Sequence, residues 1–261
     1  MKTYTLWLFN KRINSRLLPS LVTSLLLAVT PPALAGYQPP PGQRSPSGYT
    51  STTGPRGGCE ETGGTSLTVL APQHHVGQTA STHPTFAWFV PDSKPFPLEF
   101  TLYEFNSGRG PKLVQKISLQ SSPGIIKLSL PQNKPGLAIG QRYLWQVAIL
   151  CNPNYPSSDL VAKAEIEVVK MSPALKSALS TKTTRYEEIV DIYAKAGLWY
   201  DALREALGPA EDGGLRKVTS TLLEDLAKFE EIEATQVESR QSTNLRQIAK
   251  SELQQSSLRS Q

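Results

Sequence analysis

The side chains of this protein that are suited to chemistry are few and widely spaced. The imidazole and thiol groups belong to His74, His75, His83, Cys59 and Cys151. These groups are the usual ligands of zinc, but the Cys-x-x-Cys and His-x-x-x-His spacings typical of zinc sites are absent from the sequence. The histidines lie beside Pro and Gly residues, which favour turns. We therefore expect surface or turn histidines rather than metal ligands or a general base.

The common catalytic motifs are also absent from the sequence. It contains no Gly-x-Ser-x-Gly nucleophile elbow, no phosphate loop ending in Gly-Lys-Ser/Thr, no His-Glu-x-x-His and no dinucleotide fingerprint. Paired acids such as Glu187-Glu188 fall on expected helix faces, where solvation accounts for them. We expect no catalytic residues, no bound metal and no cofactor, and an enzyme ranks behind two binding functions.

Trp199 and Tyr200 are the residues best suited to contact a ligand or a protein partner. They fall in the turn of an expected helical hairpin, where exposed aromatic side chains stack on sugars or anchor a partner. The alternative is that a third helix or the sheets cover this edge of the hairpin. Asp201, the next residue, is expected at a helix start on the surface rather than as a catalyst.

The two cysteines have their own set of alternatives. An oxidising compartment allows Cys59 and Cys151 to form a disulfide. Closing so long a loop would stabilise the fold by about 4 to 5 kcal/mol in the chain-entropy description. The other outcome is a pair of buried free thiols.

The first 35 residues have the pattern of a secretory signal peptide. A basic region is formed by Lys2, Lys11, Arg12 and Arg16. An apolar run over residues 17–29 follows, and Ala33-Leu34-Ala35 is a small-residue cleavage site. The run is shorter than the roughly 20 residues of a membrane-spanning helix. We therefore expect cleavage after Ala35, a periplasmic or secreted protein and no membrane span after cleavage, with retention of the segment as an anchor as the alternative.

Charge gives no support to nucleic-acid binding. The formal net charge of the whole chain is +5, with 27 basic and 22 acidic residues. The expected signal peptide holds four of the basic residues and no acidic ones, so the remaining chain is close to neutral. Nucleic-acid-binding domains are typically far more basic than this.

Residues 65–170 have the pattern of a β-sandwich. Turn residues separate seven expected strands at residues 67–70, 85–90, 98–105, 113–119, 125–130, 143–151 and 161–169. Trp88 and Trp145 are expected on opposing inner faces of the core, with ligand stacking as the alternative. The segment around Tyr143 resembles the tyrosine corner of fibronectin-like domains, which predicts a structural hydroxyl. Together these patterns predict an antiparallel sandwich of the immunoglobulin or fibronectin type III kind.

Residues 171–237 have the period of α-helices and predict a small α-helical module. Thr184 and Glu187 form a capping box, and Gly197 ends a helix and starts a tight turn. The segment around this turn resembles the inter-helix turn of a tetratricopeptide hairpin. No 34-residue repeat accompanies it, so one helical hairpin is expected rather than an array.

Two further segments have the composition of disordered chain. Residues 36–64 are rich in Pro, Gly, Ser and Thr and predict a disordered linker. Residues 238–261 are rich in Gln, Ser and Arg and predict a flexible tail.

Several motifs in combination are similar to the cyanobacterial family called domain of unknown function 928. They are Gly57-Gly58-Cys59, Leu67-Thr68-Val69-Leu70-Ala71-Pro72, the stretch from Pro84 to Pro91, Gly140-x-x-Tyr143-x-Trp145 and the stretch from Gly197 to Leu203. The similarity extends over residues 57–232. It implies an exported cyanobacterial protein, and it transfers no catalytic residue because the family has no established activity.

These observations favour a non-enzymatic, extracytoplasmic protein-interaction protein, a scaffold or adaptor of the cell envelope. Its partner is expected to be an envelope or secreted protein. The alternative is a glycan-binding or cell-wall-binding module that uses Trp199 and Tyr200 and takes polysaccharide as its ligand.

Overall fold

The computed structural model describes residues 36–42, 44–47, 59, 64–106, 110–181, 185–208, 213–233 and 240–259. These residues belong to the compact unit Leu34–Gln261, and the other unit is Met1–Ala33. The expected signal peptide, residues 1–35, therefore lies outside the described residues. So do residues 48–63 of the expected linker, apart from Cys59.

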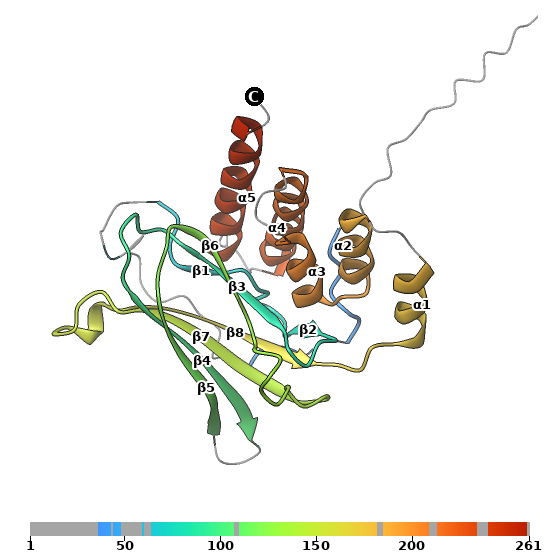
Figure 1. The fold of residues 1–261 in the computed structure, drawn as a ribbon, viewed down its shortest axis with the longest axis horizontal. Coiled ribbons are helices and arrows are strands. Elements are labelled where there is room, and N and C mark those ends of the chain that lie inside the picture. Colours follow the sequence, from blue (N-terminus) through green and yellow to red (C-terminus); the bar gives the residue numbers. More distant parts are fainter. Residues whose placement is uncertain are drawn as a thin grey trace, which may run out of the picture. The chain divides into compact units, whose positions relative to one another are not determined.

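The strands form two sheets (Figure 1). The smaller sheet has the order β1-β3-β6 and contains β1 (Thr68–Val69), β3 (Thr85–Val90) and β6 (Gly124–Ser129). The larger has the order β2-β8-β7-β4-β5 and contains β2 (Gly77–Thr79), β8 (Leu160–Val168), β7 (Arg142–Ile149), β4 (Pro97–Asn106) and β5 (Gly110–Gln120). The 3-10 turn η1 (Pro156–Ser158) leads into β8. The strand pairs are antiparallel, except that β2 runs parallel to β8.

All seven strands predicted from the sequence are present, and β2 is an addition. Strand β2 escaped prediction because its residues, Gly77, Gln78 and Thr79, include no large apolar side chain and so show no alternation of apolar and polar residues. Its pairing with β8 depends on a neighbour far away in the sequence. The sequence pattern therefore predicts the seven other strands and misses the short parallel one.

Aromatic rings join the two sheets. Phe86 of β3 lies 5.0 Å from Phe100 of β4 and 5.1 Å from Trp145 of β7, measured between ring centroids. Trp88 of β3 stacks on Phe100 at 6.2 Å. Both tryptophans are fully buried, as expected for opposing inner faces. This burial excludes the alternative in which they stack on a ligand.

Tyr143 makes the backbone hydrogen bond expected of it. Its hydroxyl accepts from the N–H of Ala138 at 2.9 Å, and its ring is buried at the start of β7. Gly140 has a positive φ of 82° within this turn, a conformation that side chains other than that of Gly rarely adopt. The turn and the tyrosine therefore hold the entry to β7 as one unit.

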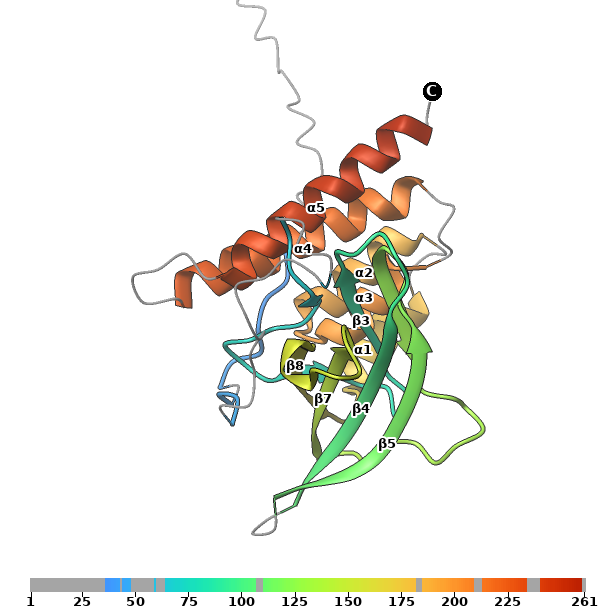
Figure 2. The same ribbon diagram turned by 90° about the vertical axis from the view of Figure 1, so that its left-hand side faces the viewer.

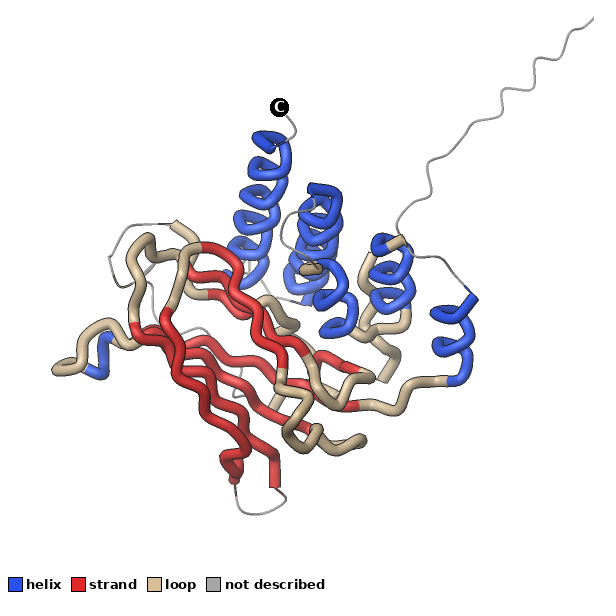
Figure 3. Tube along the Cα trace, viewed as in Figure 1, coloured by secondary structure: helices blue, strands red, loops and turns tan. Residues whose placement is uncertain are grey.

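The helices follow the strands in the sequence and gather beside the sheets (Figure 3). They are α1 (Pro173–Thr181), α2 (Tyr186–Lys195), α3 (Trp199–Ala206), α4 (Gly213–Glu233) and α5 (Arg240–Arg259). Helix α3 packs on β2, β3 and α4, while α5 packs along α4 and reaches β1 (Figure 2). The protein is therefore mixed α/β, and α3 and α5 connect the helices to the sheets.

The turn between α2 and α3 has the hydrogen bonds of a Schellman motif. The N–H of Gly197 donates to Ala194 at 3.1 Å, and that of Leu198 donates to Tyr193 at 3.0 Å. Gly197 has a φ of 75°, so the expected end of the helix at this glycine is confirmed. The expected capping residue of α2, Thr184, lies outside the described residues. Arg185 precedes the helix instead and makes no side-chain capping bond.

The C-terminal residues form a helix rather than the flexible tail predicted from their composition. Leu245, Ile248 and Ala249 of α5 are fully buried against the rest of the fold. The amide of Gln241 donates to the carbonyls of Val69 and Ala71, at 3.0 and 3.2 Å. The buried apolar residues have the i, i+3, i+4 spacing of a helix face, which the many Gln, Ser and Arg residues around them hide.

The described part of the predicted linker also lies against the fold. Tyr37 is buried, the N–H of Val76 donates to the carbonyl of Arg44 at 3.1 Å, and that of Ser47 donates to the buried carboxylate of Glu165 at 2.7 Å. The composition of residues 36–64 predicts solvated chain, but one aromatic side chain and several backbone groups are enough to anchor residues 36–42 and 44–47. The prediction of a fully disordered linker is therefore wrong for these residues.

Two leucines of α5 test whether this helix is part of the fold. Leu245 is 0% exposed and Leu253 is 43% exposed. Leu245→Ala should lower the free energy of unfolding by about 2 to 5 kcal/mol because it leaves a cavity in the core. The matched control, Leu253→Ala, should change it by less than about 0.5 kcal/mol. Urea denaturation measures both, and equal effects would contradict the packing of α5.

Candidate functional site

Trp199, expected as an exposed contact residue, is instead fully buried at the start of α3. Its indole Nε1 donates to the carbonyl of Leu70 at 2.8 Å, and its ring meets the ring of Tyr37 edge-on at 5.0 Å. The N–H and the ring of the indole are therefore both engaged in contacts inside the protein. The prediction that Trp199 contacts a partner or a glycan is therefore wrong.

Tyr200 is the second residue of that prediction, and it too is buried. Its hydroxyl accepts from Nε1 of Trp145 at 2.8 Å and donates to the carbonyl of Glu165 at 3.0 Å. Burial raises the pKa of this phenol far above its ordinary value, so it stays protonated. Gly77 makes room for the ring, because a Cβ at that position would lie 2.7 Å from Cε2 of Tyr200. Tyr200 thus joins α3 to β7 and β8 and has no free face for a ligand.

Asp201 lies at the helix start as expected, but it is buried rather than on the surface. Its Oδ2 accepts from the N–H of Ala80 at 2.8 Å, just after β2. Burial raises the pKa of this carboxyl, while the bonds from Ala80 and Thr79 and the charge of Arg204 lower it. The described contacts of the carboxylate are all structural: it fixes the end of the short parallel strand against α3.

The three histidines take different structural roles: His74 and His75 are neighbours in the sequence, and His83 lies in a later turn. His75, expected in a surface turn, is buried, and its Nε2 shares a hydrogen bond of 2.7 Å with the hydroxyl of Tyr37. His74 lies 3.5 Å from the carboxylate of Glu230, and Nε2 of His83 donates to the carbonyl of Lys134 at 3.0 Å. Among the described residues, no three His, Cys, Asp or Glu side chains cluster in a way that could hold a metal ion.

Cys59 and Cys151 form a disulfide, as expected for an oxidising compartment. Their Cα atoms are 5.3 Å apart across 92 residues of sequence. The bond connects the residue ahead of β1 to the chain that leaves β7. It therefore ties the N-terminal approach to the larger sheet.

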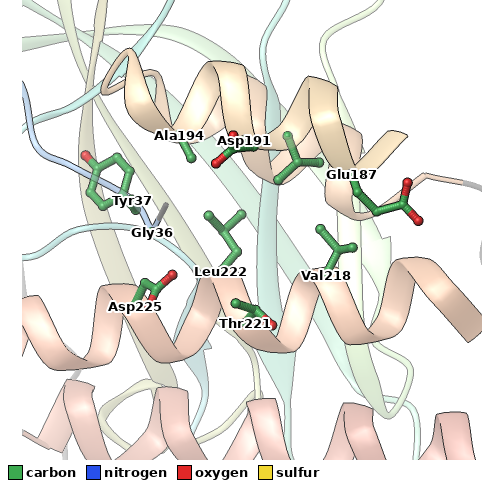
Figure 4. Close-up of a pocket in the computed structure, with 10 residues that line it drawn as sticks. Gly36, Tyr37, Glu187, Asp191, Ala194, Val218, Thr221, Leu222 and Asp225 are labelled. Carbon is green, nitrogen blue, oxygen red and sulfur yellow. The ribbon is translucent and has the colours of Figure 1, made fainter. Parts of the chain in front are cut away.

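A hollow between α2 and α4 is a candidate site in the described part of the chain (Figure 4). Its floor is apolar and consists of Val190, Ala194, Val218 and Leu222. Its rim carries Glu187, Asp191 and Asp225, with Thr221, Gly36 and Tyr37 completing the lining. The hollow holds about 290 Å³ and is open to solvent. This figure includes the solvent at its mouth, so the enclosed space is far smaller than the roughly 300 to 1,000 Å³ typical of small-molecule pockets.

The electrostatics of this hollow favour a cation. Asp191 pairs with Lys195 at 2.6 Å and Asp225 with Lys228 at 3.1 Å, and neither of these lysines lines the hollow. Oδ1 of Asp191 is buried and has no hydrogen-bond partner among the residues that the structure describes. Carboxylates over an apolar floor suit an amine carried on a short stem.

Sequence reasoning missed this hollow because three distant segments build it. Glu187 and Asp191 are spaced i, i+4 on α2, which predicts only that they share one helix face. Asp225 comes from α4, and Gly36 and Tyr37 come from the segment predicted to be disordered. The one available signal was Tyr37, an aromatic residue in second place after the expected cleavage site.

Among the described residues, no helix is long and apolar enough to cross a bilayer.

The buried phenol of Tyr200 gives a stability test. Tyr200→Phe removes the hydroxyl and leaves the N–H of Trp145 without its acceptor, so the free energy of unfolding should fall by about 1 to 3 kcal/mol. Tyr186→Phe is the matched control because Tyr186 is exposed, and it should have almost no effect. Chemical denaturation measures both variants. An unchanged Tyr200→Phe protein would refute the link between α3 and the larger sheet.

His75 gives a pH test. Burial, together with the charge of His74, lowers the pKa of His75 from 6.5 to about 4, so the unfolded chain binds this proton more readily than the folded one. The free energy of unfolding should therefore fall as the pH drops from about 6.5 to about 4, by up to about 3 kcal/mol. His75→Gln should remove this part of the slope and His83→Gln should keep it. Urea denaturation across the range checks the difference, and a slope that survives His75→Gln contradicts the assignment.

A comparison with family models agrees with the resemblance seen in the sequence, whereas a search of curated proteins finds no match to the chain. A family model described as Domain of Unknown Function (DUF928) matches residues 51–237. The match includes both sheets, the disulfide and helices α1 to α4, and it ends before α5. Because it extends over most of the sequence, the chain belongs to the DUF928 family.

Proposed function

We propose that the protein is a non-enzymatic, extracytoplasmic protein-interaction protein, a scaffold or adaptor of the cell envelope. The observation that carries this proposal is strand β5. It is 11 residues long and pairs with β4 on one side, while no strand among the described residues pairs with its other side. Its backbone therefore offers a row of donors and acceptors to an added strand.

The apolar side chains of β5 support this interaction. Leu113 is 51% exposed and Val114 is 46% exposed, side by side on the edge strand. The register of β5 on β4 shifts here, from Leu102 opposite Gln115 to Tyr103 opposite Leu113, so Val114 is an extra residue in a bulge. Bulges at sheet edges redirect side chains, and two exposed apolar residues there favour a partner surface.

The charge on β5 favours an acidic, extended segment of a partner protein. Lys112 is exposed on the strand, and Lys116 lies 2.8 Å from Glu99 of the neighbouring strand β4. Lysines on an edge strand oppose pairing of two identical edges because like charges meet. A partner strand with Asp or Glu residues would instead gain attraction from both lysines.

The proposal also includes the type of sandwich and the export of the protein. We infer a sandwich of the fibronectin type III kind, supported by the strand orders β1-β3-β6 and β5-β4-β7-β8 and by the hydrogen bond to the hydroxyl of Tyr143. We also infer export with cleavage after Ala35, supported by the signal-peptide pattern and by the disulfide.

A glycan-binding role loses the support of Trp199 and Tyr200, since both are buried.

A photo-crosslinking residue at Val114 of the full chain tests the interaction. In the native envelope it should capture one protein whose cross-linked segment is extended and acidic. Lys112→Glu should weaken the affinity for that identified partner by about tenfold or more. Lys134→Glu is the matched control because it reverses an exposed charge outside β5.

Two outcomes would contradict the proposal. One is a partner bound equally by the Lys112→Glu and unsubstituted proteins. The other is retention of the purified protein on peptidoglycan or exopolysaccharide without any protein partner, which would favour the glycan-binding alternative.

A further inference from the structure

Gly36 is singled out both by the predicted cleavage site and by its position in the structure. The sequence predicts cleavage after Ala35, which makes Gly36 the first residue of the exported chain. In the structure Gly36 lines the hollow between α2 and α4, next to the carboxylate of Asp225 (Figure 4). Cleavage would thus create a new α-amino group in a hollow lined by carboxylates.

Gly36 and Asp225 are close enough to leave no room for a side chain at position 36. A Cβ added to Gly36 would lie 2.5 Å from Oδ2 and 3.1 Å from Oδ1 of Asp225. The nitrogen of Gly36 is bonded to the same Cα atom. A rotation of the terminal residue is therefore sufficient to bring an amine there into hydrogen-bonding distance of the carboxylate.

The residues that follow fix the position of Gly36. The hydroxyl of Tyr37 shares its 2.7 Å hydrogen bond with His75, and the N–H of Gln38 donates to the carbonyl of Ala194 at 3.2 Å. Pro40 lies so close to Gly197 that a Cβ on this glycine would be 2.7 Å from it. The segment is held in one register, so a chain that began one residue earlier or later would place its amine elsewhere.

The charged groups around the hollow are mostly acidic. Asp225 comes from α4, and Asp191 and Glu187 come from α2. Their basic neighbours are Lys228, Lys195 and Arg185, which contact these carboxylates from outside the hollow. Within the described lining no side chain is cationic. A single ammonium group would fit both the charge and the small volume.

We propose that this hollow is the binding site of the protein's own α-ammonium group. Water adds across the peptide bond between Ala35 and Gly36, which leaves a carboxylate on Ala35 and a protonated amine on Gly36. This amine donates hydrogen bonds to Asp225 and holds the N-terminal segment between α2 and α4. The precursor has a neutral amide at this position, so the ion pair forms only in the cleaved protein. The inference rests on the proposed export and cleavage.

The experiment uses the full chain, exported and processed by the cell. N-terminal sequencing should begin at Gly36. The pH dependence of labelling by an amine-specific reagent should then give the α-amine a pKa about one unit above its ordinary 7.7 to 8.0. Asp225→Asn should return this pKa to the ordinary range. Glu224→Gln, which removes a charge from the same helix outside the hollow, should leave it raised.

A second measurement covers the case in which Asp225→Asn folds poorly. Selective transamination of the N-terminal glycine converts its amine to a carbonyl and leaves the lysines unchanged. It should lower the Tm of the processed unsubstituted and Glu224→Gln proteins, whether or not Asp225→Asn folds, and leave the Tm of a folded Asp225→Asn protein unaffected. An ordinary amine pKa, or equal effects in the two variants, would overturn the binding site. A Gly36 start with an ordinary pKa would leave export standing, whereas recovery of an intact Met1 form alone would overturn both.

Discussion

The arrangement of helices and sheets depends on the two hydrogen bonds made by the buried hydroxyl of Tyr200. It sits between an indole N–H of β7 and a backbone carbonyl of β8. Its two neighbours in the sequence bind elsewhere: Trp199 to the carbonyl of Leu70, and Asp201 to the N–H that follows β2. Buried polar groups need partners, so three consecutive residues allow α3 only one orientation on the sheets.

The candidate surfaces follow from this fixed helix. Gly197 turns the chain directly ahead of α3 and so sets the direction of α2, whose face toward α4 forms one wall of the hollow. Tyr37 packs on the edge of Trp199 and carries the N-terminal segment to the same place. Strand β5 lies at the far edge of the larger sheet, with three strands between it and β2. The two candidate surfaces therefore lie on different elements and can be tested separately.

The sequence predicts those parts of the protein whose signal is local. Alternation of side chains predicts seven strands, and Gly197 predicts the helical turn. Tyr37, Trp199 and Tyr200 were misjudged because aromatic residues beside turns are equally compatible with exposure and with burial under another element. Helix α5 was missed because its apolar face is narrow within a polar sequence. The hollow could not be predicted, since its carboxylates meet only after distant segments pack.

The contacts of Gln241 have a consequence for how the protein folds. This residue satisfies carbonyls at the edge of β1, 172 and 170 residues earlier in the chain. Closing loops of this length costs entropy before any contact compensates for it, and folds dominated by such contacts form slowly. The edge of the first strand stays uncovered until the last helix has left the ribosome. A chain built in this way passes through most of its synthesis without completing its fold.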